Sequence, residues 1–338
     1  MKIKWKQNAL GENMLRLFIA SLLLGIFLIG CNVPTEQKTI KDPNVTPEGV
    51  RITPNVVYGH KFGMALTFDM YQPKNPDGAG VILINSGAWV SYFPNFYKKT
   101  TEGFQLLNLE EYDQMGKRWC NILSLLESGF TVFTVRHRSA PKFEMHEIVS
   151  DLRTAVRFIR GHADKYGIDA DKLGIFGGSS GGHLALLIGT TPETAPTDAT
   201  EGYEKSPAPL AAIVVYFPVS DLTLFVDKLR GEPNLETLLK EIPSINILLN
   251  LKDDQLKEYS PINHVSSNDP PTLIIHGDKD MMVPITFGKT MSQALQNAGV
   301  ESSLFTIEGG NHGLKNKDDA DRAVSEMVKW FKKYLVNK

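Results

Sequence analysis

The stretch at residues 176–185 restricts the fold of this chain more than any other, and it reads F-G-G-S-S-G-G-H-L-A. Two serines stand among glycines, between a short apolar run at 172–176 and a helix-forming apolar run at 182–188. The first run fits a buried strand and the second fits a helix. Because glycine has no Cβ, the turn between them can be sharp and strained. The stretch therefore predicts a strand-to-helix turn that presents a serine hydroxyl.

Two serines fit the spacing of such a turn, in which glycines stand two residues before and two residues after the serine. Ser179 lies between Gly177 and Gly181, and Ser180 fits the same spacing one residue further on. The tail S-S-G-G-H-L resembles the G-x-S-[AS]-G-G-[HN]-L motif of the esterase branch of the α/β-hydrolases, whose nucleophile is the first serine. This resemblance selects Ser179, whose hydroxyl needs a neighbouring base to become reactive.

The same resemblance implies where the acid and the histidine stand, because in α/β-hydrolases they follow the serine in that order. Residues 271–283 read P-T-L-I-I-H-G-D-K-D-M-M-V and contain a core strand at 272–275. Asp280 falls where the family motif H-G-x-x-D-x-x-V-P has its acid. A further strand at 302–307 leads into E-G-G-N-H-G, which places His312 in a glycine-rich loop.

The three side chains would share the work of acyl transfer. His312 would take the proton of Ser179, and Asp280 would hold the imidazole tautomer and stabilise the imidazolium. Two other carboxylates stay open as the acid: Asp278 in the same loop, and Asp221 after another apolar strand. Asp280 is the prediction because it occupies the motif position.

Backbone N–H groups should stabilise the oxyanion of such a reaction. One belongs to Ser180, directly after the nucleophile. The others are expected in the loop after a strand at 81–84, which continues N-S-G-A-W and resembles the family's H-G-G-[GA]-W. The resemblance nominates the amides of Gly87 and Ala88, which are small enough to let a substrate oxygen approach. Asn85 replaces the family's histidine and cannot become a cation.

The remaining histidines have less distinctive surroundings. His183 and His276 are expected to pack or to form hydrogen bonds within the core. The other histidines lack the paired spacing of metal ligands, so neither a metal site nor a cofactor is predicted.

The N-terminus carries a different signal. Basic residues after Met1 precede an uncharged apolar run at 17–30, which is shorter than the roughly 20 residues that span a bilayer comfortably. This pattern is typical of a secretory signal peptide, and its final L-I-G-C resembles the bacterial lipobox. Cys31 would then be the lipidated first residue of an exported protein, tethered to the inner or the outer membrane. An uncleaved anchor helix is the alternative, and a start at Met14 is as compatible as one at Met1.

The rest of the chain suits a tether followed by one domain. Residues 31–49 are polar and proline-containing, so an extended tether is expected after the lipid. Residues 50–338 have the size of a single α/β domain. The formal net charge of -2 lacks the positive excess that is typical of nucleic-acid-binding proteins. With Cys31 lipidated, Cys120 has no disulfide partner, so the domain must rely on its core. The oligomeric state stays open.

Short apolar runs alternate with helical patterns along most of this domain. Residues 51–58 and 65–71 predict an N-terminal antiparallel pair, and helical periodicity is clear at 146–160 and 320–335. The alternation predicts an α/β fold with a mostly parallel, doubly wound sheet and helices on both faces. The predicted core strands are 81–84, 131–135, 172–176, 211–217, 272–275 and 302–307.

Two segments interrupt the alternation and are expected to cap the site. The first, 90–118, follows the N-S-G-A-W loop and is rich in aromatic residues. Together with Trp89, its Tyr92 and Phe93 are candidate substrate contacts, and packing of the segment against the body is the alternative. The second, 222–259, is rich in leucine and interrupted by prolines, so it would form cap helices that exclude water.

The resemblance covers nearly all of residues 50–338 and extends to acetyl-esterases, carbohydrate esterases and hormone-sensitive-lipase-like enzymes. It implies a serine hydrolase that cleaves a small carboxylic ester, with a short acyl or acetyl group, through an acyl-enzyme. A prolyl-oligopeptidase-like exopeptidase is one alternative, since it shares S-x-G-G and H-G-D-x-D-x-x-V-P, but a chain of 338 residues does not accommodate its usual β-propeller. A non-catalytic binding lipoprotein is the other, and the altered N-S-G-A-W loop is its only support.

Overall fold

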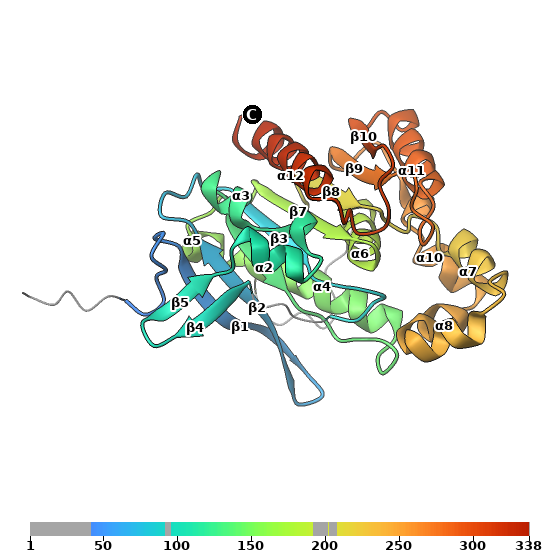
Figure 1. The fold of residues 1–338 in the computed structure, drawn as a ribbon, viewed down its shortest axis with the longest axis horizontal. Helices are drawn as coiled ribbons and strands as arrows, with labels where there is room; N and C mark the ends of the chain where they lie inside the picture. The colour runs from blue at the N-terminus through green and yellow to red at the C-terminus, as the bar shows by residue number, and fades with distance from the viewer. Residues whose placement is uncertain (1–41, 92–95, 192–201, 203–207, 338) are drawn as a thin grey trace, which may run out of the picture. The chain divides into compact units, whose positions relative to one another are not determined.

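An eight-stranded sheet runs through the part of the chain that the computed structural model describes, residues 42–91, 96–191, 202 and 208–337 (Figure 1). The strand order is β1-β2-β6-β3-β7-β8-β9-β10. The six strands from β6 to β10 in this order pair in parallel, whereas β1 and β2 pair antiparallel and β2 joins β6 antiparallel. The predicted α/β fold, with its mostly parallel sheet and antiparallel N-terminal pair, is confirmed. The strands are β1 (Arg51–Lys61), β2 (Met64–Gln72), β3 (Gly80–Ile84), β6 (Thr131–Val135), β7 (Leu173–Gly178), β8 (Ala212–Tyr216), β9 (Thr272–Gly277) and β10 (Ser302–Ile307).

Helices cover both faces of the sheet, so the central strands β3, β6, β7, β8 and β9 are buried along their whole length. Strands buried on both faces are continuous apolar runs, which is why they are recognisable in the sequence. Helices α4, α6 and α11 lie on one face, and α3 and α12 lie on the other. The helices of this body are α3 (Leu123–Glu127), α4 (Met145–Gly161), α5 (Ala163–Tyr166), α6 (Ser180–Thr190), α11 (Thr286–Asn297) and α12 (Lys317–Phe331), with the short helices η4 (Pro261–His264) and η5 (Lys332–Val336).

The two faces of the sheet belong to two hydrophobic cores, because neighbouring residues of a strand point to opposite sides. Ile82 belongs to the core under α4, α6 and α11, and its neighbour Val81 belongs to the core under α3 and α12. On the second face, a Cβ at Gly174 would lie 2.6 Å from the Phe331 ring. The C-terminal helix α12 can therefore lie close to β7, the strand that leads to Ser179.

The first insertion, 90–118, contains a small hairpin of β4 (Tyr97–Thr100) and β5 (Gly103–Leu106), followed by α2 (Leu109–Gln114) and η1 (Arg118–Cys120). Its described aromatic side chains pack on each other and on the body. The Phe96 ring centroid is 5.5 Å from that of Tyr112 and 6.4 Å from that of Tyr71. This segment therefore follows the alternative of packing against the body, and Tyr92 and Phe93 lie outside the described residues.

The second insertion, 222–259, forms a run of short helices after β8 (Figure 1). Apolar side chains on α7 and η3 face inward: Phe225 and Leu229 of α7 and Ile245 of η3 are buried. Its elements are α7 (Leu222–Arg230), α8 (Leu235–Glu241), η3 (Pro243–Ile245), α9 (Asn246–Leu249) and α10 (Asp253–Glu258).

The segment before β1 differs in part from the expected tether. Residues 42–49 pack against the body, where Thr46 is buried and its N–H donates to the Val50 carbonyl oxygen at 2.9 Å. The Phe104 N–H likewise donates to the Pro43 carbonyl oxygen at 3.1 Å. These hydrogen bonds correct the predicted tether boundary at 49, and Met14 and Cys31 lie outside the described residues.

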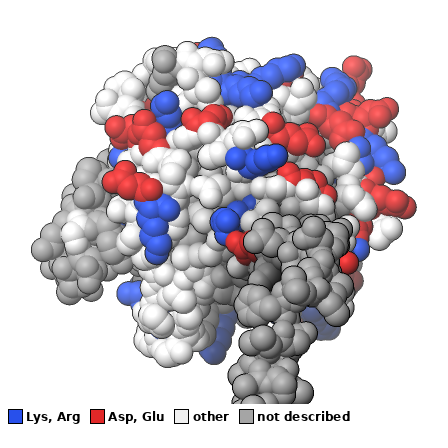
Figure 2. Space-filling view, turned by 90° about the vertical axis from the view of Figure 1, so that its left-hand side faces the viewer, with Lys and Arg blue, Asp and Glu red and all other residues white. Residues whose placement is uncertain are grey.

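Within the described residues, we find no helix with the length and apolarity to cross a membrane. Figure 2 shows basic and acidic side chains interspersed across the upper part of the face in view.

Candidate active site

Ser179 occupies the turn between β7 and α6, at the carboxyl end of a central strand. Its backbone has φ 55° and ψ -122°, a conformation that costs a residue other than glycine about 1–3 kcal/mol. Two hydrogen bonds hold it there: the Ser179 N–H donates to the Tyr216 carbonyl oxygen, and the His183 N–H donates to the Ser179 carbonyl oxygen, both at 2.9 Å. The turn leaves Ser179 partly exposed and lining a cavity.

The glycines around Ser179 are required by close backbone contacts. A Cβ at Gly177 would lie 2.5 Å from the Gly181 carbonyl oxygen, and one at Gly181 would lie 2.7 Å from the Ile84 carbonyl oxygen. Ser180, the other candidate, is the first residue of α6 and is buried, with its hydroxyl 3.2 Å from that of Ser86. Ser179 and not Ser180 therefore presents its side chain to the cavity.

His312 and Asp280 are in direct contact. They stand on loops that follow β10 and β9, and these two strands pair in parallel and so deliver both loops to one edge of the sheet. The His312 Nδ1–H donates to Asp280 Oδ2 at 2.7 Å, so Nε2 is the ring nitrogen left to accept a proton. His312 lines the same cavity as Ser179, and its ring lies tilted against that of Phe217, with centroids 4.6 Å apart.

The Asp280 carboxylate is held by four groups. Oδ1 accepts the N–H groups of Met282 and Val283, both at 2.9 Å, and Oδ2 faces the rings of His312 and His276. Burial raises the pKa of Asp280, but hydrogen bonds from His276, His312 and the Val283 backbone outweigh it. The pKa of Asp280 therefore lies well below its usual range, and the group is an anion at neutral pH.

The two rival acids are used elsewhere. Asp278 Oδ1 accepts the N–H of Gly309 at 2.7 Å and shapes the loop that carries the histidine. Asp221 Oδ1 accepts the N–H of Leu224 at 3.1 Å and so caps the N-terminus of α7. Within the described part of the chain, neither carboxylate forms a hydrogen bond with His312, whose partner is Asp280.

We call residues 85–91 the oxyanion loop, and its centre is a tight turn. The Gly87 N–H donates to the Val90 carbonyl oxygen at 3.0 Å, and the Val90 N–H donates to the Gly87 carbonyl oxygen at 2.9 Å. Ala88 and Trp89 between them have φ 48° and 60°, as in a type I′ turn. The predicted donor Gly87 is thus corrected, because its N–H is already used within the turn. Ala88 and Ser180 stay the predicted donors.

Trp89, a predicted substrate contact, is buried but contributes its ring to the cavity wall. Its indole N–H donates to His183 Nδ1 at 3.2 Å. His183 is fully buried, and burial lowers its pKa to about 4. His276 Nε2 lies 2.8 Å from the Val283 carbonyl oxygen. Both histidines form hydrogen bonds within the core, as expected.

The cavity that Ser179 and His312 share, which we call the serine cavity, has a volume of about 550 Å³. Most of its wall is apolar, and a Lys228–Glu232 ion pair of 2.6 Å stands on it. Most of these side chains are not recognisable as cavity residues from the sequence, although Met281 and Met282 could have been found because they directly follow Asp280. The missed apolar residues are Trp119, Phe217, Val219, Phe225, Leu229, Leu238, Ile242, Ile245, Met281, Met282 and Val283.

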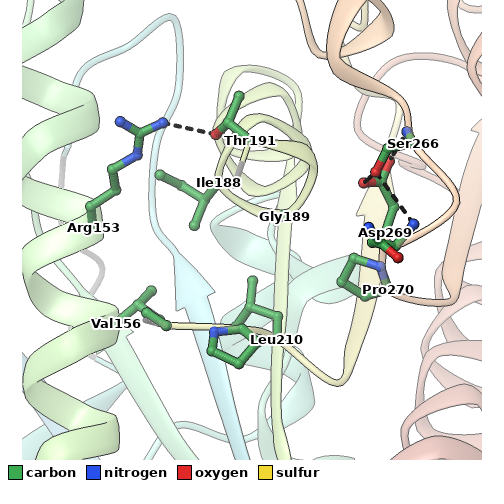
Figure 3. Close-up of a pocket in the computed structure, with 12 residues that line it drawn as sticks. Arg153, Val156, Ile188, Gly189, Thr191, Leu210, Ser266, Asp269 and Pro270 are labelled. Atoms are coloured by element: carbon green, nitrogen blue, oxygen red, sulfur yellow. Dashed lines mark hydrogen bonds between the residues drawn. The ribbon is translucent and has the colours of Figure 1, made fainter. Parts of the chain in front are cut away.

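A second cavity of about 280 Å³ lies at the other end of α6 (Figure 3). Arg153 Nη2 donates to the Thr191 hydroxyl at 2.8 Å on one side, and Asp269 accepts the N–H and hydroxyl of Ser266 on the other. The 11 residues of α6 separate it from Ser179 by roughly 16 Å. It is distinct from the serine cavity.

Comparison with known proteins gives the family. The family model described as BD-FAE matches residues 68–295, more than half of the 338-residue chain. The Probable carboxylic ester hydrolase LipM of Mycobacterium tuberculosis is 29% identical over 183 residues, covering 54% of this chain and 41% of that protein. The Acetylxylan esterase of Xylanibacter ruminicola is 27% identical over 249 residues, covering 72% of this chain and 42% of that protein. The chain thus spans less than half the length of these two relatives.

Solved structures agree on the architecture. A truncated form of a carbohydrate esterase from gut microbiota matches with a TM-score of 0.60 and 25% identity, over 84% of this chain and 95% of that one. A thermophilic esterase of Thermogutta terrifontis matches with a TM-score of 0.59 and 21% identity, over 84% and 94% of the two chains. The sheet, the turn at Ser179 and these likenesses together lead to one conclusion: the chain belongs to the BD-FAE family and has an α/β-hydrolase fold.

Proposed function

We propose that this protein is a serine hydrolase that cleaves carboxylic esters. The observation that carries the proposal is that His312, which is hydrogen-bonded to Asp280, lines one cavity with a strained, cavity-facing Ser179. A histidine held by a carboxylate is the base that a serine hydroxyl needs. The esterase relatives support the same reaction class.

In the proposed reaction, Ser179 Oγ attacks the ester carbonyl carbon while His312 Nε2 takes the hydroxyl proton. The carbonyl electron pair moves to oxygen, and the oxyanion accepts hydrogen bonds from the amides of Ala88 and Ser180. When the intermediate collapses, the bond to the alcohol oxygen breaks and the imidazolium returns the proton to the leaving alcohol. Water then attacks the acyl-serine by the same route and releases the acid, which restores Ser179.

Asp280 supports the base in two ways. Its Oδ2 accepts the Nδ1–H of His312, so Nε2 is the nitrogen that faces the reaction. Because the pKa of Asp280 is depressed, the carboxylate stays ionised and stabilises the imidazolium as it forms.

For the substrate, we propose a short acyl or acetyl ester, including esters carried on carbohydrate. Support comes from the relative named Acetylxylan esterase and from the structural likeness to a carbohydrate esterase. An acetyl group fills only a small part of a cavity of about 550 Å³. The remaining apolar wall is then available to the alcohol portion of the ester or to a larger acyl group.

The reaction is tested with a fluorophosphonate probe and p-nitrophenyl acetate on the purified protein. We expect covalent labelling of Ser179 and ester turnover. Ser179→Ala should lose both, with kcat lower by several orders of magnitude, whereas Ser180→Ala should cost much less because its backbone amide remains. A folded protein that is not labelled would instead be a binding protein on a hydrolase fold.

An exopeptidase is the second candidate, because one relative supports it. The Acylamino-acid-releasing enzyme 1 of Oryza sativa is 27% identical over 225 residues, covering 62% of this chain but only 27% of that protein. Turnover of p-nitrophenyl acetate is therefore compared with that of aminoacyl-proline anilides. Higher turnover of the anilides would replace the esterase proposal with the peptidase.

We further propose that the protein is exported and lipid-anchored through Cys31. The support is the apolar run at 17–30, which ends in L-I-G-C. In bacteria that express the full chain, the protein should partition with membranes and incorporate labelled palmitate. Cys31→Ala should abolish the labelling, and labelling that survives this substitution would contradict the proposal.

A further inference from the structure

The turn at residues 88–89 of the oxyanion loop cannot hold its shape by backbone preference alone. Ala88 and Trp89 both have positive φ, a region that residues other than glycine, asparagine and aspartate rarely adopt. Each costs about 1–3 kcal/mol when it is held there. Something outside the turn must therefore stabilise it, and the Trp89 side chain contacts two residues outside the turn, His183 and Phe225.

The Trp89 side chain is fixed by its surroundings. Its indole N–H donates to His183 Nδ1 at 3.2 Å, and the two rings lie edge to face with centroids 5.6 Å apart. Its ring also lies beside Phe225 of α7, at a centroid distance of 6.4 Å. Both Trp89 and His183 are buried, so this hydrogen bond is shielded from competing water.

His183 makes a second bond that fixes which of its nitrogens can accept. Nε2 lies 2.7 Å from the carbonyl oxygen of Tyr259, and a carbonyl can only accept, so Nε2 carries the proton. Nδ1 is then the acceptor that the Trp89 indole requires. The bond from Trp89 forms only when the ring is neutral, and burial lowers the pKa of His183 to about 4, which keeps it neutral at pH 7.

The two partners of His183 belong to different parts of the active site. Trp89 follows Ala88, the predicted oxyanion donor, and Tyr259 closes the second insertion directly after α10. His183 itself is on α6, one turn after Ser179, and its N–H donates to the Ser179 carbonyl oxygen. His183 thus contacts the serine turn through its backbone N–H, and the oxyanion loop and the end of the second insertion through its imidazole.

We propose that His183 is a positioning residue that holds the turn at 88–89 in its oxyanion-binding shape and ties it to the second insertion at Tyr259. This inference rests on the proposed ester hydrolysis, since the oxyanion forms only in that reaction. It predicts that loss of the Trp89 contact lowers kcat and leaves KM nearly unchanged, because the Ala88 amide acts in the transition state.

Two substitutions separate the two bonds of His183. Asparagine places an oxygen where Nδ1 stands, so His183→Asn keeps an acceptor for Trp89 and loses the contact with Tyr259. Glutamine places its amide nitrogen where Nε2 stands, so His183→Gln keeps a donor for Tyr259 and loses the acceptor. Trp89→Phe removes the indole donor itself, and His60→Gln on the exposed part of β1 is the matched surface control.

With p-nitrophenyl acetate, we expect His183→Gln and Trp89→Phe each to lower kcat about 10- to 100-fold, with KM changed less than about threefold. His183→Asn should stay within about fivefold of the parent protein, and His60→Gln should match it. The double variant of Trp89→Phe and His183→Gln should lose no more than either single variant, because both remove the same bond.

Three results would overturn the inference: an unchanged kcat in His183→Gln, an equal loss in His183→Asn, or losses that multiply in the double variant. The indole N–H exchange of Trp89, followed by NMR, gives a readout that needs no turnover. It should be slow in the parent and in His183→Asn, and fast in His183→Gln. If the parent hydrolyses no ester, the proposed function fails, while equally slow exchange in all three proteins would refute the positioning role alone.

Discussion

Ser179, Ala88 and Trp89 all have positive φ, and all three line the serine cavity. Strained backbone of this kind persists only where the surrounding structure fixes it. Here the fixing groups are the glycines around Ser179 and the hydrogen bonds of the oxyanion loop. At the scale of single residues, the site therefore depends on close contacts that leave no room for added atoms.

Gly181 is one of these tightly packed positions. A Cβ there would press on the Ile84 carbonyl oxygen, which is backbone and cannot rotate away, so Gly181→Ala should destabilise the fold by at least about 1–3 kcal/mol. Urea unfolding measures the change. Gly231→Ala is the control, because the nearest atom to its Cβ would be 3.5 Å away and its φ is negative. Equal stability of the two variants would contradict the steric argument.

Asp280 gives a second prediction at this scale. Asp280→Asn should lower kcat by on the order of 10⁴-fold, because the amide cannot both accept the His312 Nδ1–H and stabilise an imidazolium. Asp278→Asn should keep most of the activity, since that carboxylate bonds to a loop N–H. Steady-state kinetics with p-nitrophenyl acetate compares them, and a larger loss in Asp278→Asn would reassign the acid.

At the scale of elements, α4 supports the oxyanion loop through a buried ion pair. Arg138 Nη2 lies 2.9 Å from Asp151 Oδ1 and Nη1 lies 2.6 Å from Glu147 Oε1, and both carboxylates are on α4. The segment that carries Arg138 also contacts the loop, since the Ala140 N–H donates to the Trp89 carbonyl oxygen at 3.1 Å. Helix α4 is therefore connected to the oxyanion loop through the segment that carries Arg138 and Ala140.

Removing one partner of this pair should be costly. Asp151→Ala leaves the buried Arg138 guanidinium without its main counter-charge, and we expect a loss of about 3–5 kcal/mol in the free energy of unfolding. Asp164→Ala on the exposed side of α5 should change it by less than about 0.5 kcal/mol. Chemical denaturation of both variants decides the matter, and a loss below 1 kcal/mol in Asp151→Ala would show that the pair is not a main support.

The elements also show what a sequence can and cannot predict. The strands β3, β6, β7, β8 and β9 are buried on both faces, so their apolar runs are continuous and their positions were predicted to within two residues. The cavity wall was not predictable in this way. Phe225 and Ile245 belong to short helices whose inward faces depend on tertiary packing.

The oxyanion loop shows the same limit more sharply. The sequence N-S-G-A-W indicates a tight loop with small residues, and the structure has one. Two contacts decide which backbone N–H groups of the loop can bind an oxyanion: the hydrogen bonds between Gly87 and Val90, and the hydrogen bond from Trp89 to His183. The motif spacing does not predict either contact. For this reason Gly87 was predicted as a donor and proved to be engaged.

At the scale of the whole molecule, stability should depend on pH through buried histidines. Burial lowers the pKa of His137 and of His183 to about 4, whereas an unfolded chain binds the proton near pH 6.5. Their contribution is therefore complete above about pH 7 and is lost as the pH falls from 6.5 to 4, by up to roughly 3 kcal/mol for each group. The depressed pKa of Asp280 extends the loss below pH 4, where the unfolded carboxylate protonates first.

Urea midpoints measured between pH 4.5 and 7.5 test this dependence. The midpoint should fall towards low pH, and His183→Asn should reduce the slope because one titrating group is removed. A midpoint that stays constant over this interval would contradict the assignment of neutral, buried imidazoles.

Met281 and Met282 are 84% and 50% exposed as whole residues, although both line the serine cavity and directly follow Asp280. Their outer atoms face water, while the backbone N–H of Met282 donates a hydrogen bond to the carboxylate of Asp280. Substitutions at Met281 and Met282 can therefore change the polarity of the cavity entrance without disturbing Asp280 and His312 beneath it. Homologues that differ at these two positions could evolve a different substrate specificity while the reaction itself stays the same.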